Sequence, residues 1–123
     1  MPVAHAAGVR AVCGALPETV EDQPPTGPRW RVRGRTFAQL WALDSPTGST
    51  TLLMFRCDGE ELEVLRGAGP PFSPAAWGRD VMVMTLDDDT DWIEVGELLT
   101  ESYCIRAPKK LVALVSRPPE IGA

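Results

Sequence analysis

The sequence predicts a two-layer α+β domain, in which helices cover one face of an antiparallel sheet. Apolar residues recur at period two in the middle of the chain and at helical spacing toward its two ends. The 12 Pro and 11 Gly among 123 residues favour several short elements over a long helical bundle. With 44% hydrophobic and 24% charged residues, the chain has the size and composition of a single soluble domain.

The first half of the chain predicts a helix followed by three strands. Residues 3–16 carry apolar side chains on one helical face, and Pro17 ends this helix because proline disfavours helical geometry in the residue before it. The apolar run TTLLMFRC indicates a strand in the centre of the sheet. Strands are expected at 29–33, 36–43 and 50–57, separated by a tight turn at Gly34-Arg35 and by irregular loops at 17–28 and 44–49.

The second half predicts a short helix, one or two strands and two further helices. Asp58 to Glu61 has the D-x-x-E form of a helix start, in which the side chains bind free backbone N–H groups, and Gly67 ends this helix. Residues 67–80 allow at most a short edge strand, and 80–87 form a clear one.

A longer helix follows, with a polar cap and an apolar inner stripe. It runs to about Ile105, and a final short helix begins after Pro108. We expect one domain over residues 1–117 and a flexible tail at 118–123. The cap is Asp89, Thr90 or Asp91, and the stripe consists of Trp92, Val95, Leu99, Ser102 and Tyr103.

Arginines alternate with other residues in the segment RWRVRGR. On a strand, Arg29, Arg31 and Arg33 share one face, whereas Trp30 and Val32 share the other. The turn residue Arg35 extends the same patch. One interpretation is a solvated ladder of arginines without a functional role. The other is a basic strip that meets phosphates or an acidic protein.

The net charge of −5 conceals a segregation of charge along the chain. Seven acidic residues and no basic ones lie between Asp87 and Glu101, so the rest of the chain has 12 basic and 10 acidic residues. A second basic group is Arg106, Lys109 and Lys110. The two lysines begin a helix, where the dipole disfavours cations, which hints that they face an anion. The net charge therefore does not exclude an anionic partner.

No pattern in the sequence favours catalysis or cofactor binding. Capping explains the LDDDTD run, which lacks the glycine and the distal glutamate of a calcium loop. His5, the single histidine, lies in a helix expected to fray, and Cys13, Cys57 and Cys104 are expected to be reduced, partly buried thiols. We expect no enzyme, no cofactor and no metal. The absence of a secretory signal or an apolar span predicts a cytoplasmic protein without membrane contact.

Four segments together resemble the MmcQ/YjbR family across about residues 10–115. They are RWRVRGRTFAQL, LLMFRCDGEELEVL, VMVMTLDDDTDW and ELLTESYCIRAPKKLVA. The resemblance implies an α-β(3)-α-β(2)-α chain, similar to the type III secretion chaperone-like fold, in a bacterial DNA-binding protein. It also implies DNA contacts by Arg31, Arg33 and Arg35 around Gly34, with Lys109 and Lys110. The family often has Pro-His before the penultimate strand, where this chain has Ala75 and Ala76 after Pro74.

Three functions remain open at this point. The leading hypothesis is a DNA-binding module whose site comprises Arg29, Arg31, Arg33, Arg35, Lys109 and Lys110. The second is a protein-interaction or structural module that uses the same sheet face or the loop around Trp77. The third is an enzyme or small-molecule binder with a pocket that the sequence does not reveal.

Overall fold

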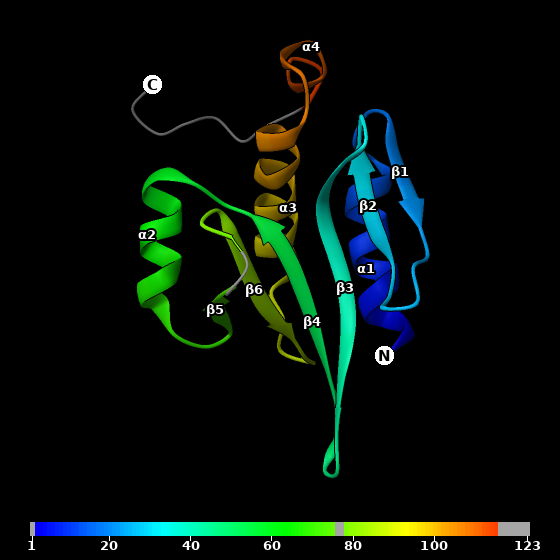
Figure 1. Ribbon diagram of the computed structural model, residues 1–123, viewed down its shortest axis with the longest axis vertical. Helices are drawn as coiled ribbons and strands as arrows, with labels where there is room; N and C mark the ends of the chain where they lie inside the picture. Colours follow the sequence, from blue (N-terminus) through cyan, green and yellow to red (C-terminus); the bar gives the residue numbers. More distant parts are fainter. Residues whose placement is uncertain (1, 76–77, 116–123) are drawn as a thin grey trace.

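A six-stranded antiparallel sheet forms one layer of the molecule, and α1 and α3 form the other (Figure 1). The computed structural model describes residues 2–75 and 78–115. The spatial order of the strands is β1-β2-β3-β4-β6-β5. The elements are α1 (Val3–Gly14), β1 (Thr19–Asp22), β2 (Arg29–Val32), β3 (Arg35–Ser45), β4 (Gly48–Arg56), α2 (Gly59–Ala68), β5 (Phe72–Pro74), β6 (Val81–Leu86), α3 (Trp92–Arg106) and α4 (Lys109–Val112).

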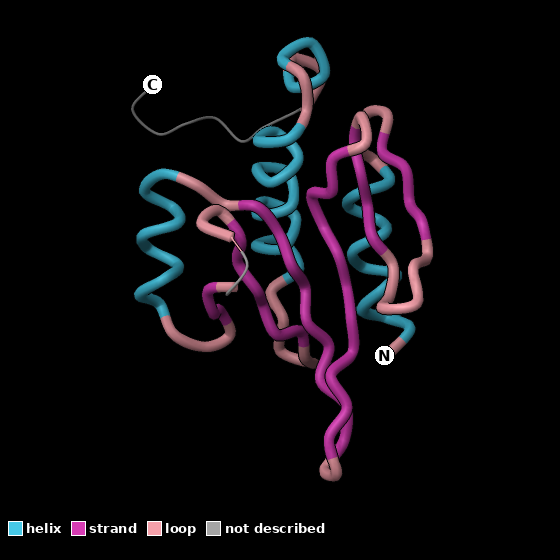
Figure 2. Tube along the Cα trace, in the orientation of Figure 1, coloured by secondary structure: helices cyan, strands magenta, loops and turns pink. Residues whose placement is uncertain are grey.

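The predicted fold class is confirmed, because the helices that contact the body of the sheet pack on one of its faces. Helix α3 crosses β3 and β4, and α1 packs beside α3 and against β1. Helix α2 packs against β5, at the far edge of the sheet, and α4 continues from the end of α3 (Figures 1 and 2). The other face of β2 and β3 carries no helix and is free to present polar side chains.

The core lies between the sheet and the two packed helices. Alternate strand residues point into it, as the period of two requires, and they meet Val95 and Leu99 of α3. The ring of Tyr103 packs edge-on against Phe37, with centroids 5.4 Å apart and planes at 89°. Its hydroxyl donates a hydrogen bond to the Pro17 carbonyl (2.7 Å), which ties the end of α3 to the segment after α1. Strand residues in this core include Trp30, Val32, Leu40, Leu53, Phe55, Met82 and Met84.

The predicted irregular loop at 17–28 is wrong in part, because it contains the edge strand β1. Residues 19–22 pair with β2 in antiparallel register, with Thr19 opposite Val32 and Asp22 opposite Arg29. A four-residue strand flanked by prolines has too short a pattern to be recognised locally. Pairing with β2 supplies the backbone hydrogen bonds that stabilise it. The chain thus has four strands before α2, one more than the family resemblance implies.

Both predicted connections around β3 are shifted in the structure. The turn occupies Arg33 and Gly34, whose φ angles of +50° and +78° are those of a two-residue hairpin turn, so Arg35 is the first residue of β3. The predicted loop at 44–49 is largely strand, since β3 extends to Ser45 and β4 begins at Gly48. The turn-forming residues of this segment predict a loop, but the two strands continue through it as a long hairpin.

The helix ends differ from the sequence predictions in detail. Asp91 is the cap of α3, and its carboxylate accepts hydrogen bonds from the N–H groups of Ile93 and Glu94 (3.0 and 3.2 Å). Asp58 precedes α2 without a side-chain cap hydrogen bond, and the helix continues through Ala68. The cap of α3 is one of the three predicted residues. The predicted side-chain cap of α2 is wrong. The predicted tail at 118–123, as well as Ala76 and Trp77, lies outside the described residues.

His5 is not in a fraying segment, contrary to the expectation from sequence. Its side chain is 8% exposed, and Nδ1 lies 2.9 Å from the Thr51 hydroxyl of β4. Because α1 packs along the edge of the core, its first turn is held in place by this contact. The histidine therefore has a structural partner in the core layer.

Candidate nucleic-acid interface

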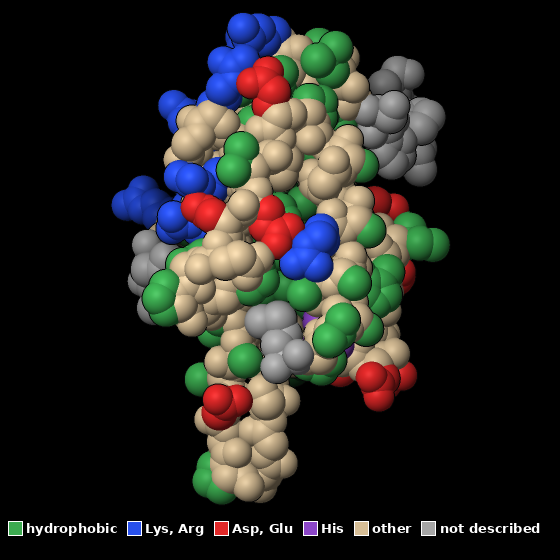
Figure 3. Space-filling model, turned by 90° about the vertical axis from the view of Figure 1, so that its right-hand side faces the viewer, with side chains coloured by type: hydrophobic (Ala, Val, Ile, Leu, Met, Phe, Trp, Pro, Cys, Tyr) green, Lys and Arg blue, Asp and Glu red, His purple; other side chains and the backbone are tan. Residues whose placement is uncertain are grey.

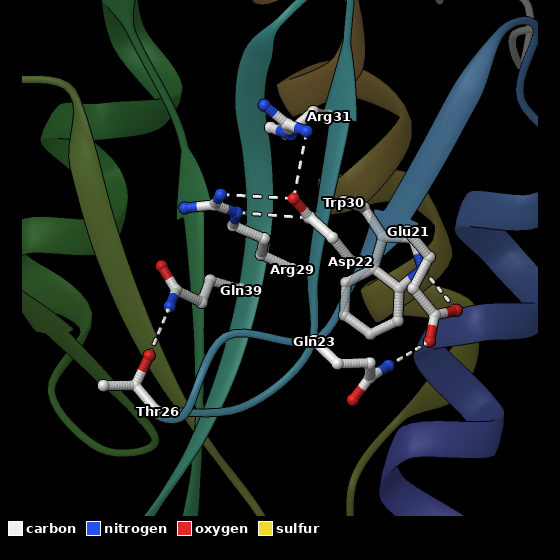
Figure 4. A network of polar contacts seen from close by, with 8 residues as sticks. All are labelled: Glu21, Asp22, Gln23, Thr26, Arg29, Trp30, Arg31 and Gln39. Atoms are coloured by element: carbon white, nitrogen blue, oxygen red, sulfur yellow. Dashed lines mark hydrogen bonds and ion pairs between the residues drawn. The ribbon is translucent and has the colours of Figure 1, made fainter.

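The outward face of β1 and β2 holds two of the predicted arginines on one carboxylate. Arg29 and Arg31 point to the face away from the helices, whereas Trp30 and Val32 are buried on the other, as predicted. Asp22 accepts two hydrogen bonds from Arg29 (both 3.1 Å), and its Oδ2 lies 3.0 Å from Nη2 of Arg31 (Figure 4). Two guanidinium groups thus share one acid, which fixes their positions and leaves a surplus positive charge.

The opposite face of the same strands carries a separate polar network around Glu21. Its carboxylate accepts hydrogen bonds from Trp30 Nε1 (3.1 Å), from Gln23 (2.6 Å) and, bidentately, from Arg10 of α1 (2.8 and 2.9 Å). These contacts hold the pKa of Glu21 below its ordinary value, with the Arg10 hydrogen bond as the largest cause. Figure 4 shows Trp30, Glu21 and Gln23 on the side of β2 away from Arg29 and Asp22. This network joins α1 to β1 and β2 and is not part of the candidate interface.

Arg33 leaves the strand and pairs with an acid of its own. It lies in the turn rather than on the face shared by Arg29 and Arg31, which corrects the sequence prediction. Its guanidinium group donates two hydrogen bonds to Glu18 (2.8 and 3.1 Å). The Arg33 hydrogen bonds are the largest cause that lowers the pKa of Glu18, and the charge of Lys110 contributes to the same shift. The start of α4 therefore lies within electrostatic reach of the hairpin turn.

Three arginines from distant parts of the chain converge at the end of the sheet next to α4. Arg35 begins β3, Arg56 ends β4 and Arg106 ends α3. Burial lowers the pKa of Arg106, and the positive charges of Arg56 and Arg35 lower it further, opposed by Asp80. Asp80 forms its ion pair with Arg56, at 3.1 Å from Nη1. Asp80 is thus near both Arg56 and Arg106, and Arg35 adds a third positive charge within reach of Arg106.

Part of this arginine cluster has no hydrogen-bond partner in the described residues. The Nε atoms of Arg56 and Arg106 are buried, and neither has an acceptor within residues 2–75 and 78–115. Arg35 is exposed and forms no ion pair with any described residue. Buried guanidinium donors are costly to leave unmatched. The exposed Arg35 guanidinium group beside them is open to an anion.

The predicted site residues lie on the outward face of the sheet and at its end next to α4. The structure adds Arg56 and Arg106 to them. In Figure 3 most Lys and Arg side chains gather toward the end of the molecule that carries α4 and along the edge below it. Arg56 gives no signal in the sequence, because it lies alone at the end of an apolar strand, and Arg106 falls in the second basic group but outside the predicted site. We call the set the basic face: Arg29, Arg31, Arg33, Arg35, Arg56, Arg106, Lys109 and Lys110, with Glu18, Asp22 and Asp80 as its paired acids.

Two further observations concern metal-binding groups and the cysteine thiols. No group of three or more His, Cys, Asp or Glu side chains that could hold a metal ion occurs in the part of the chain that the structure describes. Burial raises the pKa of the Cys57 thiol to about 12 and raises that of Cys13 further. Both cysteines are protonated, buried thiols at neutral pH. No helix among the described residues is long and apolar enough to cross a membrane.

Comparison with known proteins gives a family and a fold. The family model described as YjbR matches residues 14–105, three quarters of the chain. A crystal structure of a protein from Pseudomonas syringae, determined by a structural genomics consortium, superposes with a TM-score of 0.65 at 16% sequence identity. The match covers 86% of this chain and 99% of the other. No curated protein sequence matches significantly.

Proposed function

This chain is a member of the YjbR family, and we propose that it is a cytoplasmic, non-catalytic module that binds DNA through backbone phosphates at the basic face. The observation that carries the proposal is that Arg35 and Arg56 both lie within electrostatic reach of Arg106, with Asp80 as the acid that pairs with Arg56. The lowered pKa of Arg106 means that its positive charge is held beside like charges at a cost in stability, and a phosphate relieves that cost.

The chemistry of the cluster suits a phosphate. Guanidinium groups present several N–H donors in a planar fork that matches the oxygens of a phosphate, and the exposed group of Arg35 presents such a fork to solvent. Lys109 and Lys110 are exposed beside the cluster, at the first turn of α4. They can add point charges along a backbone that runs past it.

The paired arginines have a different role in this proposal. Asp22 and Glu18 neutralise part of the charge of Arg29, Arg31 and Arg33 and hold these side chains in fixed positions. Arginines that are already ordered lose little conformational entropy when they bind. They border the site, and the cluster with the two lysines forms its centre. The centre of the proposed site is therefore not the series of arginines at 29–33 that the sequence indicates.

A salt titration of DNA binding tests the proposal directly. We expect a fluorescein-labelled 20-base-pair duplex to bind with an affinity that falls roughly a hundredfold between about 50 and 200 mM salt, as about four phosphate contacts require. The triple variant Arg35→Ala, Lys109→Ala, Lys110→Ala removes the side chains that make up to three of these contacts. Its log–log slope should therefore flatten by about 0.9 for each phosphate that the variant no longer neutralises. Fluorescence anisotropy measures both slopes.

The matched control is Arg10→Gln, which removes one positive charge from α1. Arg10 pairs with Glu21 in the network on the opposite face of β1 and β2, away from the basic face. We expect the control to keep the slope and affinity of the unaltered protein. The proposal fails if tens of micromolar protein binds neither duplex nor single strand at about 50 mM salt, or if the control loses as much affinity as the triple variant.

A further inference from the structure

A large apolar groove lies on the helical side of the molecule, apart from the basic face. It has a volume of about 1090 Å³, at the upper limit of pockets that enclose small molecules. Its walls come from α2, α3, the end of α1 and the segment after α4; in Figure 1, α3 lies between α2 and α1. The apolar side chains of the groove include Val12, Leu16, Leu65, Ile93, Leu98 and Leu114.

Two of these apolar side chains are exposed to an unusual degree. Ile93 is 78% exposed and Leu114 is 69% exposed, and both line the groove. Large aliphatic side chains at the border of an apolar depression favour a site that another molecule covers. The groove is too open and too large to enclose a small metabolite well, but it suits a segment of polypeptide.

The border of the groove is acidic. Glu94, Glu97 and Glu101 follow one another at the spacing of a single face of α3, and Glu61 lies across the groove on α2. None of the described residues that line the groove is basic. The Glu61 side chain is largely exposed, yet the surrounding protein atoms and the charges of Glu101, Asp58 and Glu97 raise its pKa. Carboxylates that crowd in this way are complementary to a cationic partner.

The walls also determine which backbone conformation fits. Most of the walls are helical, with the turn at 15–17 and the segment after α4 as the remainder, and helical residues use their backbone N–H and C=O groups within their own helix. An extended peptide would find few backbone partners there, whereas a helix satisfies its own backbone groups. From Ile93 to Glu101, α3 offers a wall about 12 Å long, which corresponds to between two and three turns of a partner helix.

We propose that this groove docks a basic amphipathic helix of a partner protein, with apolar anchors at i, i+3, i+4 and i+7 and Lys or Arg residues on both flanks. The anchors fill the space between α2 and α3, and the flanking cations meet Glu61 on one side and Glu94, Glu97 and Glu101 on the other. The groove and the basic face share no residue, so this inference stands independently of DNA binding.

A synthetic peptide tests the inference in the full-length protein. The probe is a fluorescein-labelled 16-residue peptide of Leu and Lys with the Leu residues on one helical face, and anisotropy reports its binding. We expect saturable binding, weakened about tenfold by Glu97→Lys and unchanged by Asp44→Lys, which makes the same charge change in the exposed β3–β4 hairpin. A peptide with Gln in place of Leu should bind at least tenfold more weakly, because it has no apolar anchors.

A second variant covers the case in which Glu97→Lys does not fold. Leu114→Gln removes an exposed apolar side chain, and we expect it to weaken the peptide about fivefold. The proposal is overturned if the Leu/Lys peptide does not bind at 100 μM, or if Asp44→Lys weakens it as much as Glu97→Lys. It is also overturned if binding rises tenfold or more in a chain that ends at Val115, since residues 116–123 would then be the natural occupant. Self-association abolished by Glu97→Lys would identify a second copy as the occupant instead.

Discussion

Ser102 joins α3 to the two central strands, and its replacement by alanine should be strongly destabilising. The side chain is fully buried. Its hydroxyl donates a hydrogen bond to the Phe37 carbonyl of β3 (2.5 Å) and accepts one from the Arg56 N–H of β4 (2.7 Å). Ser102→Ala leaves both backbone groups buried without these partners. Each such group costs about 1–3 kcal/mol, so we expect a loss of about 2–6 kcal/mol for the two together.

Urea denaturation followed by tryptophan fluorescence measures this loss, because the buried Trp30 ring becomes solvated on unfolding. With a slope of about 1.5 kcal/mol per M, the midpoint should fall by roughly 1.3–4 M. The matched control is Thr100→Ala on the same helix, whose hydroxyl donates to the Gly96 carbonyl (2.7 Å), an acceptor already within the helix. We expect this control to stay within about 0.5 kcal/mol. A Ser102→Ala loss as small as that of the control would refute the reasoning, since both backbone groups would then find other partners.

Three further predictions concern stability. Gly96→Ala should raise the free energy of unfolding by about 0.5–1 kcal/mol, because the added Cβ would make only an ordinary contact at 3.9 Å; a loss of stability in urea titration would contradict this. Glu61→Gln should stabilise the protein at pH 7 and have no effect near pH 3, since the raised pKa means that folding favours the protonated form; equal gains at both pH values would argue against it. Glu18, Glu21 and Asp22 have lowered pKa values, so their contribution is complete above their ordinary values of 4.5, 4.5 and 3.8 and is lost as the pH falls through the folded values. The melting temperature should therefore decrease below about pH 4.5, and a constant value down to about pH 3 would exclude this contribution.

Local patterns in the sequence predicted most of the elements. The alternation in RWRVR places Trp30 and Val32 in the core and Arg29 and Arg31 outside it, because successive strand residues point to opposite faces. The helical stripe of α3 likewise predicted the buried side chains of Val95, Leu99, Ser102 and Tyr103. These predictions succeed because periodicity depends on residues that are close in sequence.

The errors arose where structure depends on distant partners. The edge strand β1 has only four residues, and pairing with β2, which includes the contact of Asp22 with Arg29, stabilises it. The predicted β3–β4 hairpin is likewise too short, because Pro46 and Gly48 are typical of loops and the sequence therefore predicts a loop at 44–49. In both cases cross-strand hydrogen bonds and side-chain pairs outweighed the local preference.

The sequence by itself determined the fold class, the family, the two faces of β2 and the segregation of charge along the chain. Only the tertiary structure decided which charges meet. It paired Arg29, Arg31 and Arg33 with acids of β1 and the segment before it, and it brought Arg35, Arg56 and Arg106 together from three separate elements. The physical reason is that strand pairing and helix packing juxtapose residues from 7 to 71 positions apart, as in Asp22–Arg29 and Arg35–Arg106. Charge interactions depend on that distance in space and not on separation along the chain.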